Sequence, residues 1–83
     1  MNYTPELFGE VLKRKIAERN SIEAIANWAY DVQIYICKDR NDWFYDLVLT
    51  MEMMGIGEEF EYTYEELEKI ANDLIAGKEV KLG

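Results

Sequence analysis

Histidine is absent from the 83-residue sequence, and cysteine occurs once, as Cys37. Without histidine the chain cannot form a Ser-His-Asp triad, a Cys-His nucleophile pair or a histidine-ligated zinc or haem site. The isoleucine neighbours of Cys37 indicate a buried thiol rather than a nucleophile. These absences remove the commonest kinds of enzyme chemistry, so we expect a protein that is not an enzyme and that holds no cofactor.

Basic residues are scarce, since nine Lys and Arg stand against seventeen Asp and Glu and give a formal net charge of -8. A surface of this charge repels phosphate backbones and anionic lipid headgroups. No stretch reaches the roughly 18 consecutive apolar residues of a membrane span. We therefore expect neither direct nucleic-acid binding nor association with a membrane.

Features of secreted proteins are missing as well. A single cysteine cannot form an internal disulfide, whereas small secreted domains usually hold several. Residues 1–11 contain neither the basic stretch nor the apolar run of a signal peptide. These observations predict a cytoplasmic location.

Apolar residues are plentiful enough for one small core. Hydrophobic residues make up 49% of the chain and aromatic residues 13%, which is far from the composition of a disordered segment. A chain of this length suffices for one domain and is too short for two. The sequence predicts a single helical domain over residues 1–83, a monomer, in which residues 78–83 form a tail that can fray.

Helix-start signals and apolar spacing predict the first two helices. Thr4, followed by proline and glutamate, marks the start of a helix that ends near Arg19. We expect Asn20 to adopt the left-handed conformation after it. Ser21 can then cap a second helix over residues 22–38, and the short connection predicts a helical hairpin.

The second of these helices leaves an alternative open. Residues 22–38 are apolar over most of a helix circumference, which predicts a central position in the fold. The tract Val32–Cys37 is β-branched and aromatic and is also compatible with a strand. The alanines and isoleucines before this tract keep a helical period without any turn signal, so a helix is favoured.

The third helix is predicted over about residues 42–54. Asp39 or Asn41 can cap its start. We expect Gly55 to end it in the left-handed conformation.

The fourth helix has the clearest local signature. Thr63 and Glu66 fit a capping box, and the helix is predicted over residues 63–76, with Gly77 as its stop. Four helices with short connections predict an all-α fold, a compact antiparallel bundle of about four helices. The residues predicted at the centre of its core are Ile25, Ala29, Val32, Ile36, Leu47, Leu67, Ile70 and Leu74.

Acidic residues are concentrated in residues 41–68, which hold nine Asp and Glu and no Lys or Arg. The same segment carries six of the eleven aromatic residues. One interpretation is a solvated acidic face beside core aromatics. The other is a surface for a basic protein partner, because acids steer the encounter and Tyr and Trp anchor it. The candidate partner-binding residues are Asp42, Trp43, Tyr45, Asp46, Glu58, Glu59, Glu61 and Tyr62.

Carboxylate pairs raise the question of a metal site. Glu58 and Glu61 are three residues apart, as are Glu65 and Glu68, and such pairs on a helix can share a cation. The first pair falls in a predicted loop, and Glu66 is already explained by the capping box. Too few facing carboxylates remain for a metal cage, so we expect no metal site.

Three segments support a resemblance to a known class of protein. They are Ala26–Tyr30, Met51–Glu52 and Glu61–Leu67, and their order in a small acidic helical chain resembles that of bacterial toxin-immunity proteins. The resemblance implies that the chain neutralises a co-produced toxin with an acidic surface that covers the toxin's active site or basic groove. Immunity proteins of nuclease colicins carry a tyrosine pair followed by proline on a short third helix. This sequence has no such element, so the resemblance extends to the mode of action and not to individual residues.

Two hypotheses of function follow. The first is a non-catalytic acidic protein that neutralises a bacterial toxin domain. The alternative is another acidic protein-interaction module or regulator, including an inhibitor that imitates nucleic acid. Both predict a basic protein partner.

Overall fold

Helices account for most of the described chain, which comprises residues 3–36 and 42–82 of a computed structural model. The α-helices are α1 (Pro5–Ala17), α2 (Ile22–Ile36), α3 (Trp43–Glu52) and α4 (Tyr64–Ile75). Two short 3-10 helices, η1 (Met53–Gly55) and η2 (Glu58–Phe60), connect α3 to α4. No strand occurs in residues 3–36 and 42–82, so the predicted all-α fold is confirmed.

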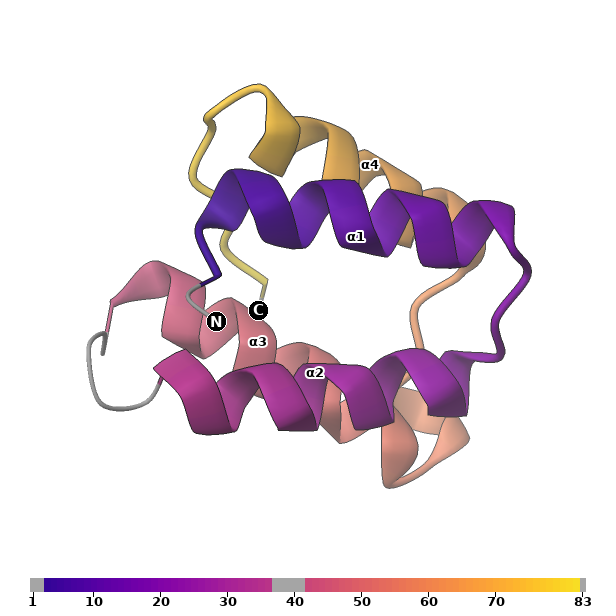
Figure 1. The fold of residues 1–83 in the computed structure, drawn as a ribbon. Coiled ribbons are helices and arrows are strands. Elements are labelled where there is room, and N and C mark those ends of the chain that lie inside the picture. Colours follow the sequence, from indigo (N-terminus) through magenta and orange to yellow (C-terminus); the bar gives the residue numbers. More distant parts are fainter. Residues whose placement is uncertain (1–2, 37–41, 83) are drawn as a thin grey trace.

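The helices form two pairs that lie in two layers (Figure 1). α1 packs mainly against α4, and α2 packs mainly against α3 and η1. Successive α-helices run in opposite directions across the view, which confirms the antiparallel bundle. The first two helices follow each other in antiparallel directions, as the predicted hairpin requires. Each nevertheless packs mainly against another helix, α1 against α4 and α2 against α3.

Aromatic rings join the two layers. Phe8 of α1 stacks on Trp28 of α2 at 4.5 Å between ring centroids and meets Phe44 of α3 edge-on at 5.5 Å. Tyr3 lies edge-on to both Phe8 and Trp28. Because stacked and edge-on pairs are the favoured aromatic geometries, this cluster fixes how the layers face each other.

The core matches the residues that the apolar spacing predicts. Ile25, Ala29, Val32 and Ile36 of α2, together with Leu47 of α3 and Leu67, Ile70 and Leu74 of α4, are all buried. Apolar residues at three- and four-residue spacing share one side of a helix, which explains why these core residues could be predicted from the sequence.

Three helix starts agree with the predictions. The Thr4 side chain accepts a hydrogen bond from the Leu7 N–H at 3.1 Å, and Ser21 Oγ accepts one from the Ala24 N–H at 3.1 Å. Both arms of the capping box between Thr63 and Glu66 are formed. Asp42 occupies the N-cap position of α3 without a side-chain capping bond, and the predicted caps Asp39 and Asn41 lie outside the described residues.

Two of the predicted helix ends are wrong. The left-handed residue after α1 is Arg19, with φ of 60°, rather than Asn20. Gly55 is not left-handed, because α3 tightens into η1 and the chain leaves through Ile56 with φ of -85°. A 3-10 turn satisfies the last carbonyls of a helix without a left-handed residue. Gly77 ends α4 with φ of 83°, as predicted.

The second helix shows one success and one failure of the sequence analysis. Val32–Ile36 is helical, which excludes the strand for that part of the tract, while Cys37 lies outside the described residues. The predicted central position of this helix is wrong, because Tyr30, Ile34 and Tyr35 are exposed. Two helix pairs leave each helix one side facing solvent, so the wide apolar circumference of α2 cannot be fully covered.

The C-terminal tail runs back over the fold. Val80 is buried and Leu82 packs partly against the core. The tail therefore contributes to the surface between α3 and α4.

Candidate interaction surface

The structure divides the predicted partner-binding residues into two groups. Asp42, Trp43, Tyr45 and Asp46 lie at the start of α3, whereas residues 58–62 lie beyond its end, in and after η2. Ten helical residues rise by about 15 Å, so the two groups are separated by the length of α3 (Figure 1). They do not form one continuous acidic and aromatic cluster.

The group at the start of α3 is partly occupied by the protein itself. Trp43 is half-buried, and it lines a surface hollow of about 330 Å³ together with Asp46, Lys81 and Leu82. The Tyr45 hydroxyl accepts a hydrogen bond from Gln33 Nε2 at 3.3 Å. Lys81, which is remote in sequence, thus places a positive charge beside the acids at this end.

Tyr62 has a similar environment. It is half-buried and lines a second hollow, of about 340 Å³, with Lys69, Lys81 and Leu82 among its neighbours. Lys81 and Leu82 therefore line both hollows. The C-terminal tail links two aromatic residues that the sequence analysis treated as free anchors.

Glu58, Glu59 and Glu61 have a different environment. All three are exposed, and no ion pair is recorded for them within the part of the chain that the structure describes. Exposed carboxylates outside any ion pair project their charge toward solvent, which is the condition for steering a positively charged partner. Of the two groups, this one fits the predicted role better.

Glu52, at the end of α3, differs from the exposed acids. Its Oε2 atom is buried and has no hydrogen-bond partner among the described residues. Burial raises the pKa of the Glu52 carboxyl above its ordinary value, because a low-dielectric environment disfavours the charged form. The sequence analysis counted this residue among the acids without distinguishing it.

The two layers differ sharply in charge. The described parts of the α2–α3 layer, residues 22–36 and 42–61, contain no Lys or Arg. Seven basic residues belong to α1 and the turn after it, to α4 and to the C-terminal tail. The acids of the α2–α3 layer are Glu23, Asp31, Asp42, Asp46, Glu52, Glu58, Glu59 and Glu61. The uneven distribution of charge along the sequence therefore gives the α2–α3 layer most of the net negative charge in the described structure.

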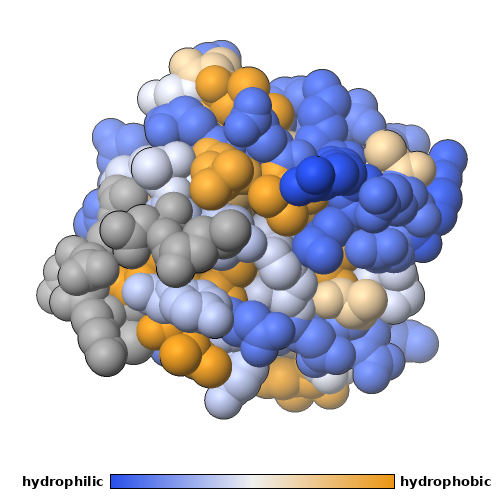
Figure 2. All heavy atoms as spheres, viewed as in Figure 1, coloured by the Kyte–Doolittle hydropathy of each residue, from blue (hydrophilic) through white to orange (hydrophobic). Residues whose placement is uncertain are grey.

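Exposed apolar side chains follow the same division. Ile34 is 51% exposed, Met53 39% and Ile56 73%, and all three belong to the α2–α3 layer with Tyr30 and Tyr35. Ile75, 39% exposed, lies on α4. In Figure 2, hydrophobic side chains reach the surface at the lower edge of the view, over this layer, and also in its upper half. The sequence analysis missed these residues, although the wide apolar circumference of residues 22–38 was the available signal.

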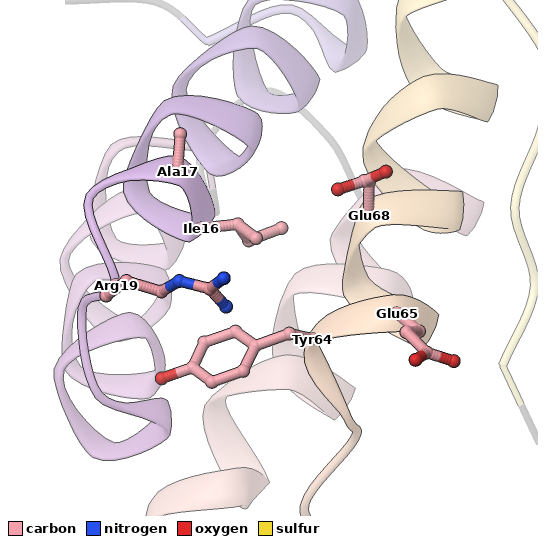
Figure 3. Close-up of a pocket in the computed structure, with 6 residues that line it drawn as sticks. All are labelled: Ile16, Ala17, Arg19, Tyr64, Glu65 and Glu68. Carbon is pink, nitrogen blue, oxygen red and sulfur yellow. The ribbon is translucent and has the colours of Figure 1, made fainter.

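A third surface hollow, of about 410 Å³, lies between the end of α1 and the start of α4 (Figure 3). The Arg19 guanidinium lies over the Tyr64 ring at 5.9 Å, and the Tyr64 hydroxyl donates to the Asn20 carbonyl at 2.7 Å. Glu65 and Glu68 also line this hollow. The contacts of Arg19 and Tyr64 hold the turn between α1 and α2 against the start of α4, which is a structural role.

The described residues form neither a metal-ligand cluster nor a membrane-spanning helix. Within residues 3–36 and 42–82, no three Asp, Glu or Cys side chains are grouped as metal ligands would be. No helix in those ranges is long and apolar enough to cross a membrane. The Glu58–Glu61 and Glu65–Glu68 pairs thus have no third ligand beside them in the described structure.

Comparisons with family models, with curated proteins and with solved structures find no match for this chain. The inference of function therefore depends on the charge and exposure of its own residues.

Proposed function

We propose that this protein is a non-catalytic acidic binding protein that neutralises a bacterial toxin in the cytoplasm by covering the toxin's active or basic site. The observation that carries the proposal is the α2–α3 layer, whose described residues contain eight acids and no base. A protein that cleaves nucleic acid or binds another polyanion needs a basic site, and an acidic surface complements such a site.

The exposed Glu58, Glu59 and Glu61 supply the steering field in this proposal. Charges at the rim of an interface act mainly on the association rate, and their effect falls as salt screens them. Rapid capture matters for an immunity protein because the toxin must be covered before it reaches its target.

The first step of the test is to isolate the partner. The protein is used to capture its partner from the native host, and the captured chain is then purified and expressed with and without this protein. The proposal predicts that the captured chain alone stops growth and that co-expression restores it. A captured chain that binds tightly without being toxic would favour the alternative, a regulator of another basic protein.

Kinetics with the purified chain test the role of the acids. Changing Glu58, Glu59 and Glu61 together to Gln should slow association and flatten its dependence on salt, with little change in dissociation. The matched control changes Glu6, Glu10 and Glu18 of the opposite layer to Gln, which alters the net charge equally. If both triple variants behave alike, net charge alone matters and the acidic layer is not the binding surface.

A further inference from the structure

Four exposed apolar side chains on the α2–α3 layer have no evident role in stability. Tyr30, Ile34, Met53 and Ile56, here called the apolar face, are between 39% and 73% exposed. Soluble monomers commonly expose single hydrophobic residues, but neighbouring ones mark interaction sites.

Neighbouring positions in the fold bring these residues together. Tyr30 and Ile34 are four residues apart on α2 and thus lie on one side of the helix. η1 packs against α2, and a side chain at Gly55 would lie 3.5 Å from the Cβ of Ala26, one turn before Tyr30. Met53 and Ile56 stand on either side of Gly55 in the chain, and the Ile56 N–H donates to the Met53 carbonyl, so both lie near the part of α2 that precedes Tyr30.

The core does not require these four side chains. The buried side of α2 is formed by Ile25, Ala29, Val32 and Ile36, which lie on another side of the helix. An exposed isoleucine gains no burial energy in the free protein. The apolar face becomes favourable only when another surface covers it.

We propose that the apolar face is the centre of the docking site, and that its occupant is a protein surface with an apolar hollow surrounded by Lys and Arg. The charge of the layer selects this occupant, because residues 22–36 and 42–61 surround the apolar face with acids and no base. This inference rests on the proposed function for the basic character of the partner, and it adds the position and chemistry of the contact.

The same charge argues against other occupants. A symmetric contact between two copies would bring together two layers whose described residues hold eight acids and no base, and these like charges would repel. An anionic lipid surface or a nucleic acid is repelled for the same reason. A basic protein is attracted by the rim and gains apolar burial at the centre, which is the usual anatomy of an interface.

Two sets of residues have different roles in the proposed contact. Ile56 is the most exposed large apolar side chain of the described structure and stands beside η2, where Glu58 and Glu59 lie. Ile56 and Ile34 fill the partner's apolar hollow, while the η2 glutamates face its basic rim. Buried anchors control dissociation and rim charges control association, so the two sets of residues have separable kinetic effects.

The experiment uses the captured and purified chain of the previous section as its probe. Ile34→Ser combined with Ile56→Ser should speed dissociation on the order of tenfold or more, with association and its salt dependence nearly unchanged. The matched control is Ile75→Ser, which removes an exposed isoleucine from the opposite layer and should leave both rates unchanged. Urea unfolding of each variant checks that the fold persists, and Tyr30→Ala provides a second probe of the same face.

The outcomes separate this inference from the proposed function. If the glutamate variants slow association but the double isoleucine variant dissociates like Ile75→Ser, the acidic surface stands and the apolar face is not its centre. If the isoleucine variant dissociates faster while the glutamate variants change nothing, the apolar face binds a partner that is not selected by charge, and the occupant proposed here is wrong. Self-association of the wild type that Ile34→Ser abolishes, measured by sedimentation, would assign the face to a second copy instead.

Discussion

Glu52 illustrates how much one residue's surroundings matter in this chain. It is one of nine acids between residues 41 and 68, yet its Oε2 is buried without a partner while its acidic neighbours in η2 face water. Burial raises its pKa, so the folded protein binds a proton at Glu52 more readily than the unfolded chain does. Stability then increases as the pH falls from above the folded pKa toward 4.5, the ordinary value.

Glu52→Gln should therefore reduce the pH dependence of stability. We expect the variant to gain stability relative to the wild type near neutral pH, and we expect this advantage to shrink as the pH falls and Glu52 becomes protonated. Urea unfolding of both proteins at several pH values measures the difference. Glu59→Gln, an exposed acid of the same layer, is the control, and an identical pH trend in both variants would show that burial of Glu52 has no effect on stability.

At the scale of a single helix, local hydrogen bonds determine where α4 begins. The Thr63 N–H donates to Glu66 Oε1 at 2.9 Å, and the Glu66 N–H donates to Thr63 Oγ1 at 3.1 Å. Each bond satisfies an N–H group that the helix itself leaves without a partner. Because the two residues are only three apart in the sequence, the sequence alone was sufficient to predict this start.

Thr63→Ala should lower the free energy of unfolding by about 1 kcal/mol, since it leaves an N–H of the first turn without its acceptor. Equilibrium urea unfolding gives this value directly. Thr50→Ala is the control, because the Thr50 hydroxyl donates to the Asp46 carbonyl within α3 and caps nothing. Equal effects of the two substitutions would contradict a capping role for Thr63.

The pairing of α1 with α4 depends on the absence of a side chain at Gly9. A Cβ atom there would lie 2.8 Å from the Ala71 carbonyl oxygen and 2.9 Å from the Leu74 Cβ. Both distances are shorter than van der Waals contact, and a backbone carbonyl cannot move aside without shifting α4. The two helices thus approach each other closely at Gly9.

Gly9→Ala should destabilise the protein by about 1–3 kcal/mol, although alanine is the better helix former by about 1 kcal/mol. Gly55→Ala is the matched control, because its Cβ would meet the nearest side chain at an ordinary 3.5 Å. Thermal and urea unfolding of both variants test this. A stabilised Gly9→Ala protein would mean that α1 and α4 are farther apart than described.

For the whole molecule, the separation of charge between layers has an energetic consequence. The α2–α3 layer carries eight acids without a base in its described residues, whereas α1 sets Lys13, Arg14 and Lys15 near its own acids. Like charges on one layer repel each other, and added salt screens the repulsion. The concentration of acids on the described residues of this layer therefore lowers the stability of the free protein.

Changing Glu58, Glu59 and Glu61 to Gln should raise the urea midpoint at low ionic strength, and the gain should shrink as salt is added. The control triple variant at Glu6, Glu10 and Glu18 should gain less, because those acids lie on a helix that also carries bases. Urea unfolding of the two triple variants is measured on the free protein, without a binding partner. Equal gains in the two variants would indicate that net charge, rather than its distribution, governs stability.

The sequence by itself determined the features that depend on near neighbours in the chain. Apolar spacing placed Ile25, Leu67 and Ile70 in the core, and the capping motifs at Thr4 and Thr63 fixed two helix starts, because period and capping are properties of a few consecutive residues. The left-handed turn at Arg19 and the 3-10 exit of α3 were not predicted by this local analysis.

Tertiary structure alone decided the layout of the candidate site. Sequence distance placed Trp43 and Glu58 in one acidic segment, but a rigid ten-residue helix separates them, and the tail brings Lys81 beside Trp43. Whether the apolar side chains of α2 are covered also depends on how many neighbours the helix has. Ile34 lies away from the buried side of α2 and is 51% exposed, so a residue typical of a core lies on the surface.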